Sequence, residues 1–374
     1  MKPAAIGSFA VVVPAYNASG TIAECLEAIL SSTRNPREVI VYHDGLTDKL
    51  MQIALAPHVR VISNPGAPVG PARGRNISVR EATCDVVIFV DADVIVAKDA
   101  FRLLLEEMEK DDQVWAAFGS YDHVPRVTRR AALYANLRHH WVHQSGEREA
   151  VTFWAGLGAM RRDAFWAAGG FDEGSSGPAV EDIALGAKLI HRGGRIRLVP
   201  NALGTHCKDW TIAQLWRTDI FHRAIPWARL LASGASVGGH LNGASRERVS
   251  AALAYLTLIA LAGCFVSMWS GVAFALFALS YISLNRGLFR LLLRCGGILA
   301  LMEGVTLHWI YHLYASAAYM LVKLHLVPPT KNRLGEDATN APSVVPLKTD
   351  LLGSGTIGDE KNESTMPKGP KPQA

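Results

Sequence analysis

The chain has 374 residues, which at roughly 150 residues per domain suggests about two domains. Apolar residues make up 49% and charged residues 19%, a balance that excludes a wholly disordered chain. The 38 basic and 33 acidic residues give a net charge of +5, too small an excess to indicate a nucleic-acid partner. The five cysteines include no C-x-x-C pair, which favours reduced thiols over disulfides or a zinc site.

Composition divides the chain into three parts. Residues 1–245 mix charges with short apolar runs, and their N-terminal end has no long apolar segment typical of a signal peptide. We therefore expect a folded cytosolic domain. Between Val249 and Asn285 there is no Asp, Glu, Lys or Arg, and we assign residues 246–326 to membrane helices. Residues 327–374 are rich in Pro, Gly, Ser, Thr and charge, which predicts a disordered tail.

Strand-like and helix-like segments alternate in the first part. Apolar runs at 9–13, 38–42, 59–62 and 86–90 predict strands, and 70–82 and 99–110 predict helices between them. Another helix follows Thr21, which has capping-box spacing to Glu24. This alternation predicts an α/β fold with a mostly parallel sheet and helices on both faces. Ligands of such sheets bind beyond the carboxyl ends of the strands.

Polar clusters follow three of these strands. They are Pro14-Ala15-Tyr16-Asn17, the segment 43–48 (HDGLTD) and Asp91-Ala92-Asp93. Two carboxylates at the end of a buried strand repel each other unless a cation joins them, and their oxygens suit Mg²⁺ or Mn²⁺. The alternative is a solvated turn in which Asp99 caps the next helix.

The ordered set of motifs is more specific than any one of them. VVVPAYNASGTIAECLEAIL, VIVYHDGLTD, NPGAPVGPARGRNISVREATCDVVIFVDAD, FWAGLGAMRRDAFWAAGGFDE, Glu181-Asp182 and PNALGTH follow one another within residues 9–230. This series resembles the family-2 inverting glycosyltransferases of the GT-A fold, which has a Rossmann-like sheet. The resemblance implies a nucleotide-diphosphate sugar donor, a hydroxyl acceptor, and Mg²⁺ or Mn²⁺.

The resemblance also implies roles for single residues. Pro14, Ala15, Tyr16 and Asn17 would line the nucleobase pocket, and Asp44 would bind the base. Arg75 would reach the base or the diphosphate. Asp91, with Ala92 between the acids, would lie near the ribose, and Asp93 and His206 would hold the metal. Asp182 would be the catalytic base with Glu181 beside it, and Gly156 and Gly158 would let the backbone approach the donor sugar.

The chemistry of an inverting displacement requires only one general base. Inversion by direct displacement needs one group to deprotonate the acceptor hydroxyl, and Asp182 is sufficient. The alternative for Glu181 and Asp182 is a pair of acids in the first turn of a helix at 180–191. His206 could equally be a structural histidine.

Several features depart from the family pattern. The family commonly has an acid at the position of His43 and Ser at that of Leu46, which leaves the base of the donor open. The Q-x-x-R-W motif of processive polymerases is absent, with Gln214–Arg217 a near match and Arg223…Trp227 further on. We therefore expect transfer of a single sugar.

Two basic clusters have simpler interpretations. His139, His140 and His143 include an i, i+4 pair that could bind zinc, but no Glu or Cys partner is evident, which favours a solvated or interfacial helix face. The arginines 126, 129, 130 and 138 are expected at the surface, where they could face anionic lipid or an acceptor phosphate.

The uncharged stretch is long enough for two spans with a turn near Trp269-Ser270-Gly271. Arginines flank both ends, which would return both ends to the cytosol. The segment 298–322 contains Glu303, His308 and His312 and could cross the membrane or lie along it.

We therefore expect a multi-pass enzyme of the cytoplasmic membrane, with its glycosyltransferase domain facing the cytosol. Anchoring favours a lipid-linked acceptor, while a soluble acceptor stays open. The rival hypothesis is a non-catalytic nucleotide-sugar sensor or scaffold in a membrane assembly. A nucleotidyltransferase is disfavoured because the chain has no G-x-x-x-x-G-K-[ST] loop.

Overall fold

The computed structural model describes residues 5–45, 58–64, 66–174, 180–232 and 245–327. Met1–Asn332 form one compact unit, and the second unit, Arg333–Ala374, lies outside the described residues. Leu46, Thr47 and Asp48 and nearly all of the predicted tail also lie outside them. The boundaries predicted at 245 and 326 stay predictions.

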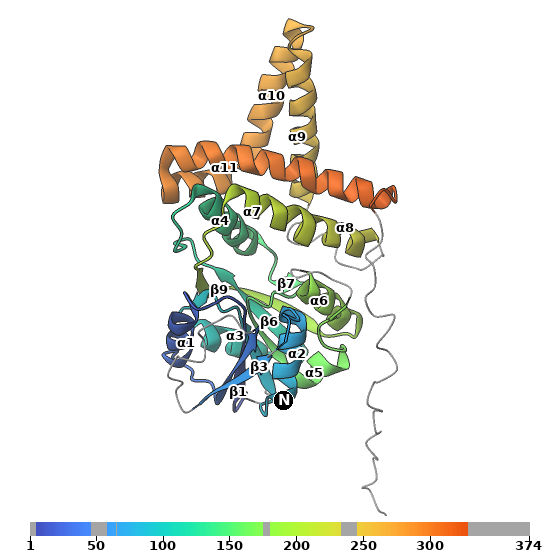
Figure 1. The fold of residues 1–374 in the computed structure, drawn as a ribbon. Helices are drawn as coiled ribbons and strands as arrows, with labels where there is room; N and C mark the ends of the chain where they lie inside the picture. The colour runs from blue at the N-terminus through green and yellow to red at the C-terminus, as the bar shows by residue number, and fades with distance from the viewer. Residues whose placement is uncertain (1–4, 46–57, 65, 175–179, 233–244, 328–374) are drawn as a thin grey trace, which may run out of the picture. The chain divides into compact units, whose positions relative to one another are not determined.

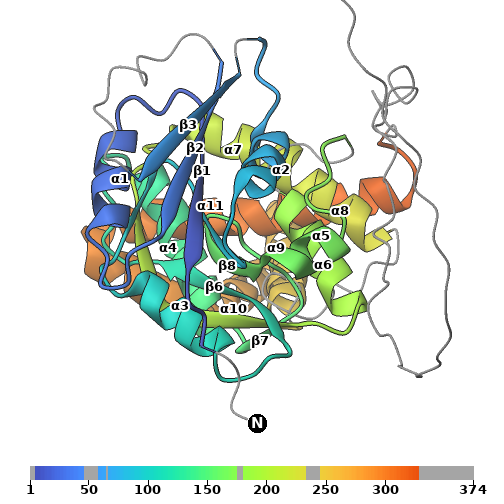
Figure 2. The same cartoon turned by 90° about the horizontal axis from the view of Figure 1, so that it is seen from below.

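A mixed sheet forms the centre of the first 210 residues (Figures 1 and 2). Its strands lie in the order β3-β2-β1-β4-β8-β6-β9-β5, with β7 paired to β9. Their bounds are β1 Phe9–Ala15, β2 Glu38–Asp44, β3 Val59–Asn64, β4 Val86–Val90, β5 Val94–Val96, β6 Val114–Tyr121, β7 Glu149–Ala150, β8 Leu157–Arg161 and β9 Arg195–His206.

The four strands predicted from apolar runs are all present, but the sheet is less parallel than expected. The pairs β1–β2, β2–β3, β1–β4 and β6–β9 are parallel, whereas β4–β8, β6–β8, β5–β9 and β7–β9 are antiparallel. Every antiparallel pair includes at least one strand from residues 94–206, a region for which the apolar runs predicted no strand. The prediction of a mostly parallel sheet is therefore wrong for this half.

Helices cover both faces of the sheet, as predicted (Figure 2). One face packs against α1 (Ile22–Leu30) and α3 (Ala100–Met108), through residues such as Phe101 and Leu104. The other packs against α2 (Pro71–Glu81), α5 (Arg162–Ala167) and α6 (Glu181–His191), where Phe89, Phe165 and Phe171 form an aromatic cluster.

Helix α1 begins directly after Thr21, but the predicted capping box does not form. The Thr21 hydroxyl donates to the Ala18 carbonyl at 3.4 Å, and Glu24 pairs with Arg126. The spacing therefore located the helix start correctly and its contacts wrongly. The loop hydrogen bond and the distant arginine compete for the two side chains that a capping box needs.

A layer of helices lies beside the sheet domain and packs around a third hydrophobic core (Figure 1). It contains α4 (Arg130–Ser145), α7 (Ile212–Arg217), the π-helix η2 (Thr218–Ala224), α8 (Ile225–Ala232), α9 (Ser245–Gly263), α10 (Met268–Leu284) and α11 (Arg286–Lys323). Helix α11 contacts α4, α8 and α9, and Gly297, with φ of 72°, interrupts it directly before the segment 298–322.

The structure does not support the predicted transmembrane helices. Among the described residues, no helix combines the length and the apolar character that crossing a bilayer requires. Helix α10 has 17 residues, about 26 Å at ~1.5 Å per residue, against a hydrocarbon layer of ~30 Å. Helix α9 has 19 residues, but Arg246, Glu247 and Arg248 occupy its first turn. The uncharged stretch was long enough in total, but the turn between α9 and α10 divides it into pieces that are too short.

Candidate active site

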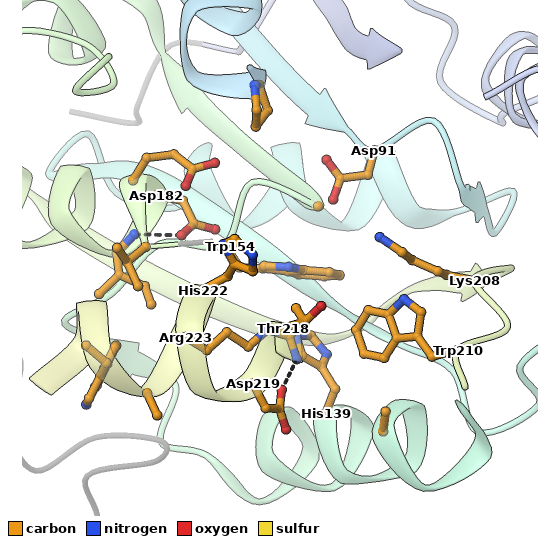
Figure 3. Close-up of a pocket in the computed structure, with 18 of the residues that line it drawn as sticks. Asp91, His139, Trp154, Asp182, Lys208, Trp210, Thr218, Asp219, His222 and Arg223 are labelled. Atoms are coloured by element: carbon orange, nitrogen blue, oxygen red, sulfur yellow. Dashed lines mark hydrogen bonds and ion pairs between the residues drawn. The ribbon is translucent and has the colours of Figure 1, made fainter. Parts of the chain in front are cut away.

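The polar clusters meet at one edge of the sheet. Strands β1, β2 and β4 are parallel neighbours, so their carboxyl ends lie together, and antiparallel β8 begins at the same edge with Leu157 opposite Val90. A cavity of about 1760 Å³ opens there (Figure 3). Twelve of the fourteen predicted site residues line this cavity: Pro14, Ala15, Tyr16, Asn17, Asp44, Arg75, Asp91, Ala92, Asp93, Gly156, Glu181 and Asp182. The two acids on which the interpretation depends most, Asp93 and Asp182, therefore share one cavity.

Asp182 is the acid best placed to accept a proton. It lies in the first turn of α6, where its carboxylate accepts hydrogen bonds from the backbone N–H of Ala155 at 3.0 Å and of Ile183 at 2.8 Å. Burial, and then the neighbouring charge of Glu181, raise the pKa of Asp182 to about 7. A general base works best when its pKa lies near the working pH, so this environment suits the predicted role.

Arg75 connects the two acidic clusters. Its guanidinium, 6% exposed, donates to Asp91 at 2.6 Å and to Glu181 at 3.0 Å. This arginine comes from α2, while the acids follow β4 and begin α6. The bridge joins the neighbour of the candidate metal ligand Asp93 to the neighbour of the candidate base Asp182. The predicted contact of Arg75 with the base or diphosphate of a donor stays a prediction.

Asp44 organises a loop at the end of β2. Its carboxylate accepts hydrogen bonds from the backbone N–H of Val69 and Gly70 and from the Asn64 side chain, at 2.8–3.1 Å. Because an ionised carboxylate has about four acceptor positions, these donors leave little free capacity for a nucleobase. The structure therefore adds a loop-closing role to the predicted one.

The two predicted glycines differ in position. Gly156 lines the cavity, and a Cβ atom there would lie 2.5 Å from the Trp154 ring. Gly158 lies within β8, outside the cavity lining, where a Cβ atom would lie 2.4 Å from the Trp154 carbonyl oxygen. Tight packing in the sheet accounts for Gly158 without any ligand.

Asp93 is joined to a buried histidine. Nε2 of His206, at the end of β9, lies 3.6 Å from Oδ2 of Asp93, and His206 lies behind Asp93 rather than in the cavity wall. Burial alone would raise the pKa of Asp93, but the hydrogen bond and charge of His206 outweigh it, so that pKa is lowered.

Asn136 of α4 determines which nitrogen of His206 carries the proton. The Asn136 amide donates through Nδ2 to the Ala132 carbonyl at 2.9 Å, so Oδ1 faces Nδ1 of His206 at 2.7 Å. Nδ1 must then donate to Asn136, and Nε2 faces the Asp93 carboxylate. Once Nε2 gives up its proton, the carboxylate and the imidazole nitrogen together are a donor set that fits a divalent cation such as Mn²⁺. The described residues contain no group of three or more His, Cys, Asp or Glu that could hold a metal ion, so the other ligands would come from substrate or water.

A cluster of rings separates the sheet from the helical layer (Figure 3). His139 of α4 lies 4.5 Å from Tyr121 and 4.7 Å from Trp154, centroid to centroid, and His143 is buried beside Phe118. The expected solvated or interfacial face is therefore wrong for His139 and His143. The i, i+4 spacing placed them on one face correctly, but only the tertiary structure shows that this face borders the cavity.

Of the four arginines expected at the surface, three are exposed and one lies in the cavity wall. Arg126, Arg129 and Arg130 are more than half exposed and pair with Glu24, Asp209 and Glu303. Arg138 instead lines the cavity with its side chain 11% exposed and stacks 3.9 Å from the Tyr311 ring centroid. Its place on the inner side of α4 explains the difference.

The residues of the near match to Q-x-x-R-W lie partly inside and partly outside the cavity lining. Gln214, Arg223 and Trp227 line the cavity, while Trp216 and Arg217 are exposed and outside its lining. Lys208 and Trp210 were not predicted as site residues, although Lys208 projects into the same space as Asp91 (Figure 3). The only sequence signal for them was their position shortly after the H of PNALGTH.

Parts of the chain are similar in sequence to known proteins. Residues 10–169 match the model of Glycosyl transferase family 2. An uncharacterized glycosyltransferase YibD of Escherichia coli K12 is 36% identical over 107 residues, 27% of this chain and 30% of its own length. A poly-beta-1,6-N-acetyl-D-glucosamine synthase of Staphylococcus aureus is 25% identical over 237 residues, 60% of this chain and 53% of its own length. The chain thus spans about a third to a half of these relatives.

Among solved structures, a mannosyltransferase from Pyrobaculum calidifontis in complex with GDP-Man and Mn²⁺ aligns with a TM-score of 0.48 and 21% identity, over 84% of this chain and 86% of that one. The match to the family model covers β1 to β8 and α1 to α5, together with Asp91, Asp93 and Gly156. The sequence similarity to family-2 glycosyltransferases therefore lies in residues 10–169.

Proposed function

We propose that the protein is a metal-dependent, inverting glycosyltransferase that moves one sugar from a nucleotide-diphosphate donor to a hydroxyl acceptor. The observation that carries the proposal is the shared cavity of Asp93 and Asp182, combined with the raised pKa of Asp182. The donor would occupy the part lined by Tyr16, Asp44, Asp91 and Asp93, which we call the donor lobe.

The proposed reaction is a single displacement. The acceptor oxygen forms a bond to C1 of the sugar as its proton passes to the Asp182 carboxylate. The bond between C1 and the diphosphate oxygen breaks, and the diphosphate leaves with the electron pair. A divalent cation held by Asp93 and His206 would stabilise the negative charge on the departing diphosphate. Lys208 faces the same space and adds a second positive charge there.

Donor turnover tests this proposal. Hydrolysis or transfer would be measured for a panel of nucleotide sugars with Mn²⁺, using the wild type, Asp93→Ala and Asp182→Asn. We expect both variants to lose at least about a hundredfold in turnover, since a general base alone contributes roughly 10²–10⁴-fold. Asp163→Asn, an exposed acid in the first turn of α5, is the matched control. Nucleotide binding without any turnover in the wild type would instead support the sensor hypothesis.

Product size tests the single-sugar part of the proposal. The Q-x-x-R-W motif of processive enzymes is absent, and Arg217 of the near match lies outside the cavity lining. Mass spectrometry of the product should show one added sugar per acceptor, whereas a ladder of products would refute this part.

We further propose that the enzyme works against the cytosolic surface of a membrane. The turn between α9 and α10 exposes Phe265, Val266, Met268 and Trp269 by 94%, 88%, 82% and 74%. A separate cavity of about 700 Å³ is lined by Arg286, Arg290 and Arg294, at the start of α11. The apolar tip could enter the hydrocarbon region of a lipid surface, and the arginines could contact its anionic headgroups.

Flotation with vesicles of phosphatidylglycerol and phosphatidylcholine tests this location. We expect the wild type to float, and a Phe265→Glu, Trp269→Glu double variant to remain in solution. Val124→Glu, which changes an exposed apolar residue (65% exposed) far along the chain, is the control and should float like the wild type. Equal flotation of all three proteins would refute the surface contact.

A further inference from the structure

The cavity continues from the donor lobe into the helical layer. This second part, which we call the acceptor lobe, is lined by Arg138, Asp219, Arg223, Trp227, Arg248 and Tyr311. Pockets for single small ligands typically measure ~300–1000 Å³, so a cavity of about 1760 Å³ has room for a second substrate beside the donor. The lobe is built by α4, η2, α8, α9 and α11, and of these helices only α4 lies inside the region matched by the family model.

Positive charge exceeds negative charge in the acceptor lobe. Asp219, 2% exposed, accepts from Arg138 at 3.3 Å and from Arg223 at 2.9 Å, and also from the Tyr314 hydroxyl at 2.8 Å. One carboxylate therefore serves two guanidinium groups. Glu247, the other acid in the lining, is occupied by Arg246 at 3.2 Å and His312 at 3.3 Å. Arg248 adds a further cation to the wall.

Arg138 has binding capacity that the described residues do not use. Its Nη1 atom is buried and has no hydrogen-bond partner among them. Its guanidinium plane is held 3.9 Å from the Tyr311 centroid, and that of Arg223 lies 5.1 Å from the Trp210 centroid. Stacked guanidinium groups lose little freedom when they bind an anion, and their forked donors match phosphate oxygens.

The two lobes meet at Tyr121. Its ring stacks 4.4 Å from the His206 ring and lies 4.8 Å from the Trp154 ring, centroid to centroid. Tyr121, Asp182 and Arg223 all line the same cavity, so a substrate bound at Arg223 shares one continuous space with the candidate base.

We propose that the acceptor lobe binds an acceptor that carries a phosphate group, held between Arg138 and Arg223 while its hydroxyl lies beside Asp182. This inference rests on the proposed function and specifies the class of its acceptor. A phosphate suits the site because its three free oxygens can accept from two guanidinium groups at once. The phosphate could belong to a lipid-linked or a soluble acceptor, and the test separates these sources.

Calorimetric titration of phosphate probes tests the proposal. The protein would first be saturated with Mn²⁺ and a nucleoside diphosphate, so that the donor lobe is filled; if no nucleotide binds, the free protein is titrated. The soluble probe is glycerol 3-phosphate with glycerol as its neutral match. The lipid probe is phosphatidic acid in detergent micelles, matched by phosphatidylcholine.

The variants are chosen to fold. Arg223→Gln removes a side chain that is 39% exposed, and Arg138→Lys keeps the buried charge but loses the fork. Arg217→Gln, an exposed arginine on neighbouring α7, is the matched control. We expect Arg223→Gln and Arg138→Lys to weaken phosphate binding at least tenfold, with Arg217→Gln like the wild type.

Each outcome is decisive. Binding of both probes supports phosphate recognition with either source, and binding of phosphatidic acid alone supports a lipid-linked acceptor. Failure of both probes, or equal binding to the wild type and Arg223→Gln, refutes the proposal. Absence of donor turnover in the wild type would refute the proposed function instead, and it is measured separately.

Discussion

Nδ1 of His206 lies 2.7 Å from Oδ1 of Asn136, and this contact ties the helical layer to the candidate metal site. Asn136 belongs to α4 and is 2% exposed, while His206 ends β9 and contacts Asp93. A hydrogen bond behind a metal ligand orients its ring, and losing one typically costs 10–100-fold in metal affinity.

We predict that Asn136→Leu weakens Mn²⁺ binding at least about tenfold, because Nδ1 of His206 then lacks an acceptor. Asn136→Asp keeps the acceptor and should restore most of the affinity. Mn²⁺ binding followed by electron paramagnetic resonance measures this directly, without turnover. Equal Mn²⁺ affinity in Asn136→Leu and the wild type would show that His206 does not depend on Asn136.

The pH dependence of turnover should reflect Asp182. Its pKa of about 7 means that the base is protonated, and turnover falls, as the pH drops through this range. Glu181→Gln removes the like charge beside it and should move the acid limb of the profile to lower pH. The profile of kcat/KM against pH measures this shift, and an unmoved limb would contradict the role of Glu181.

The same pKa has a consequence for stability. Between about pH 4 and pH 7 the folded protein holds a proton on Asp182 that the unfolded chain has released, so stability falls as the pH rises through this window. Asp182→Asn cannot titrate. We therefore predict that the Tm of the wild type falls relative to Asp182→Asn between pH 5 and pH 8. Parallel Tm curves for the two proteins would contradict the raised pKa.

Arg75 should be essential for stability as well as for the site. Replacing it with Met leaves the buried Glu181 and the partly exposed Asp91 without their bridge. Breaking a buried ion pair by removing one partner costs roughly 3–5 kcal/mol. Chemical denaturation should show this loss. Arg102→Met is the control, because Arg102 pairs with Asp99 and Glu106 on the exposed surface of α3 and should leave the midpoint unchanged.

Gly186 positions the helix that carries the candidate base. A Cβ atom there would lie 2.4 Å from the backbone N of Phe153, so Gly186→Ala must push α6 away from the loop before β8. We predict a loss of roughly 1–3 kcal/mol, the usual cost of overpacking, together with reduced turnover. Gly271→Ala in α10 meets nothing within 4 Å and should be neutral or slightly stabilising. Denaturation midpoints of the two variants decide this.

The four strands β1 to β4 could be predicted from the sequence, together with the grouping of the predicted site residues around one cavity. A five-residue apolar run such as 86–90 favours a buried strand, and neighbouring parallel strands end at one edge of a sheet. Asp44, Asp91 and Asp93 could therefore be predicted to lie near one another. The ordered motifs then added Glu181 and Asp182 by resemblance.

Contacts between segments far apart in the sequence could not be predicted and are visible only in the folded chain. The bridge from Arg75 to Glu181 joins residues 106 positions apart, and Asn136 reaches His206 across 70. The packing of the elements also places His139 and Arg138 at the cavity, and neither α9 nor α10 combines the length and the apolar character that spanning a bilayer requires. Periodicity identifies which residues share a face of a helix, but what covers that face depends on packing between elements, which local sequence does not encode.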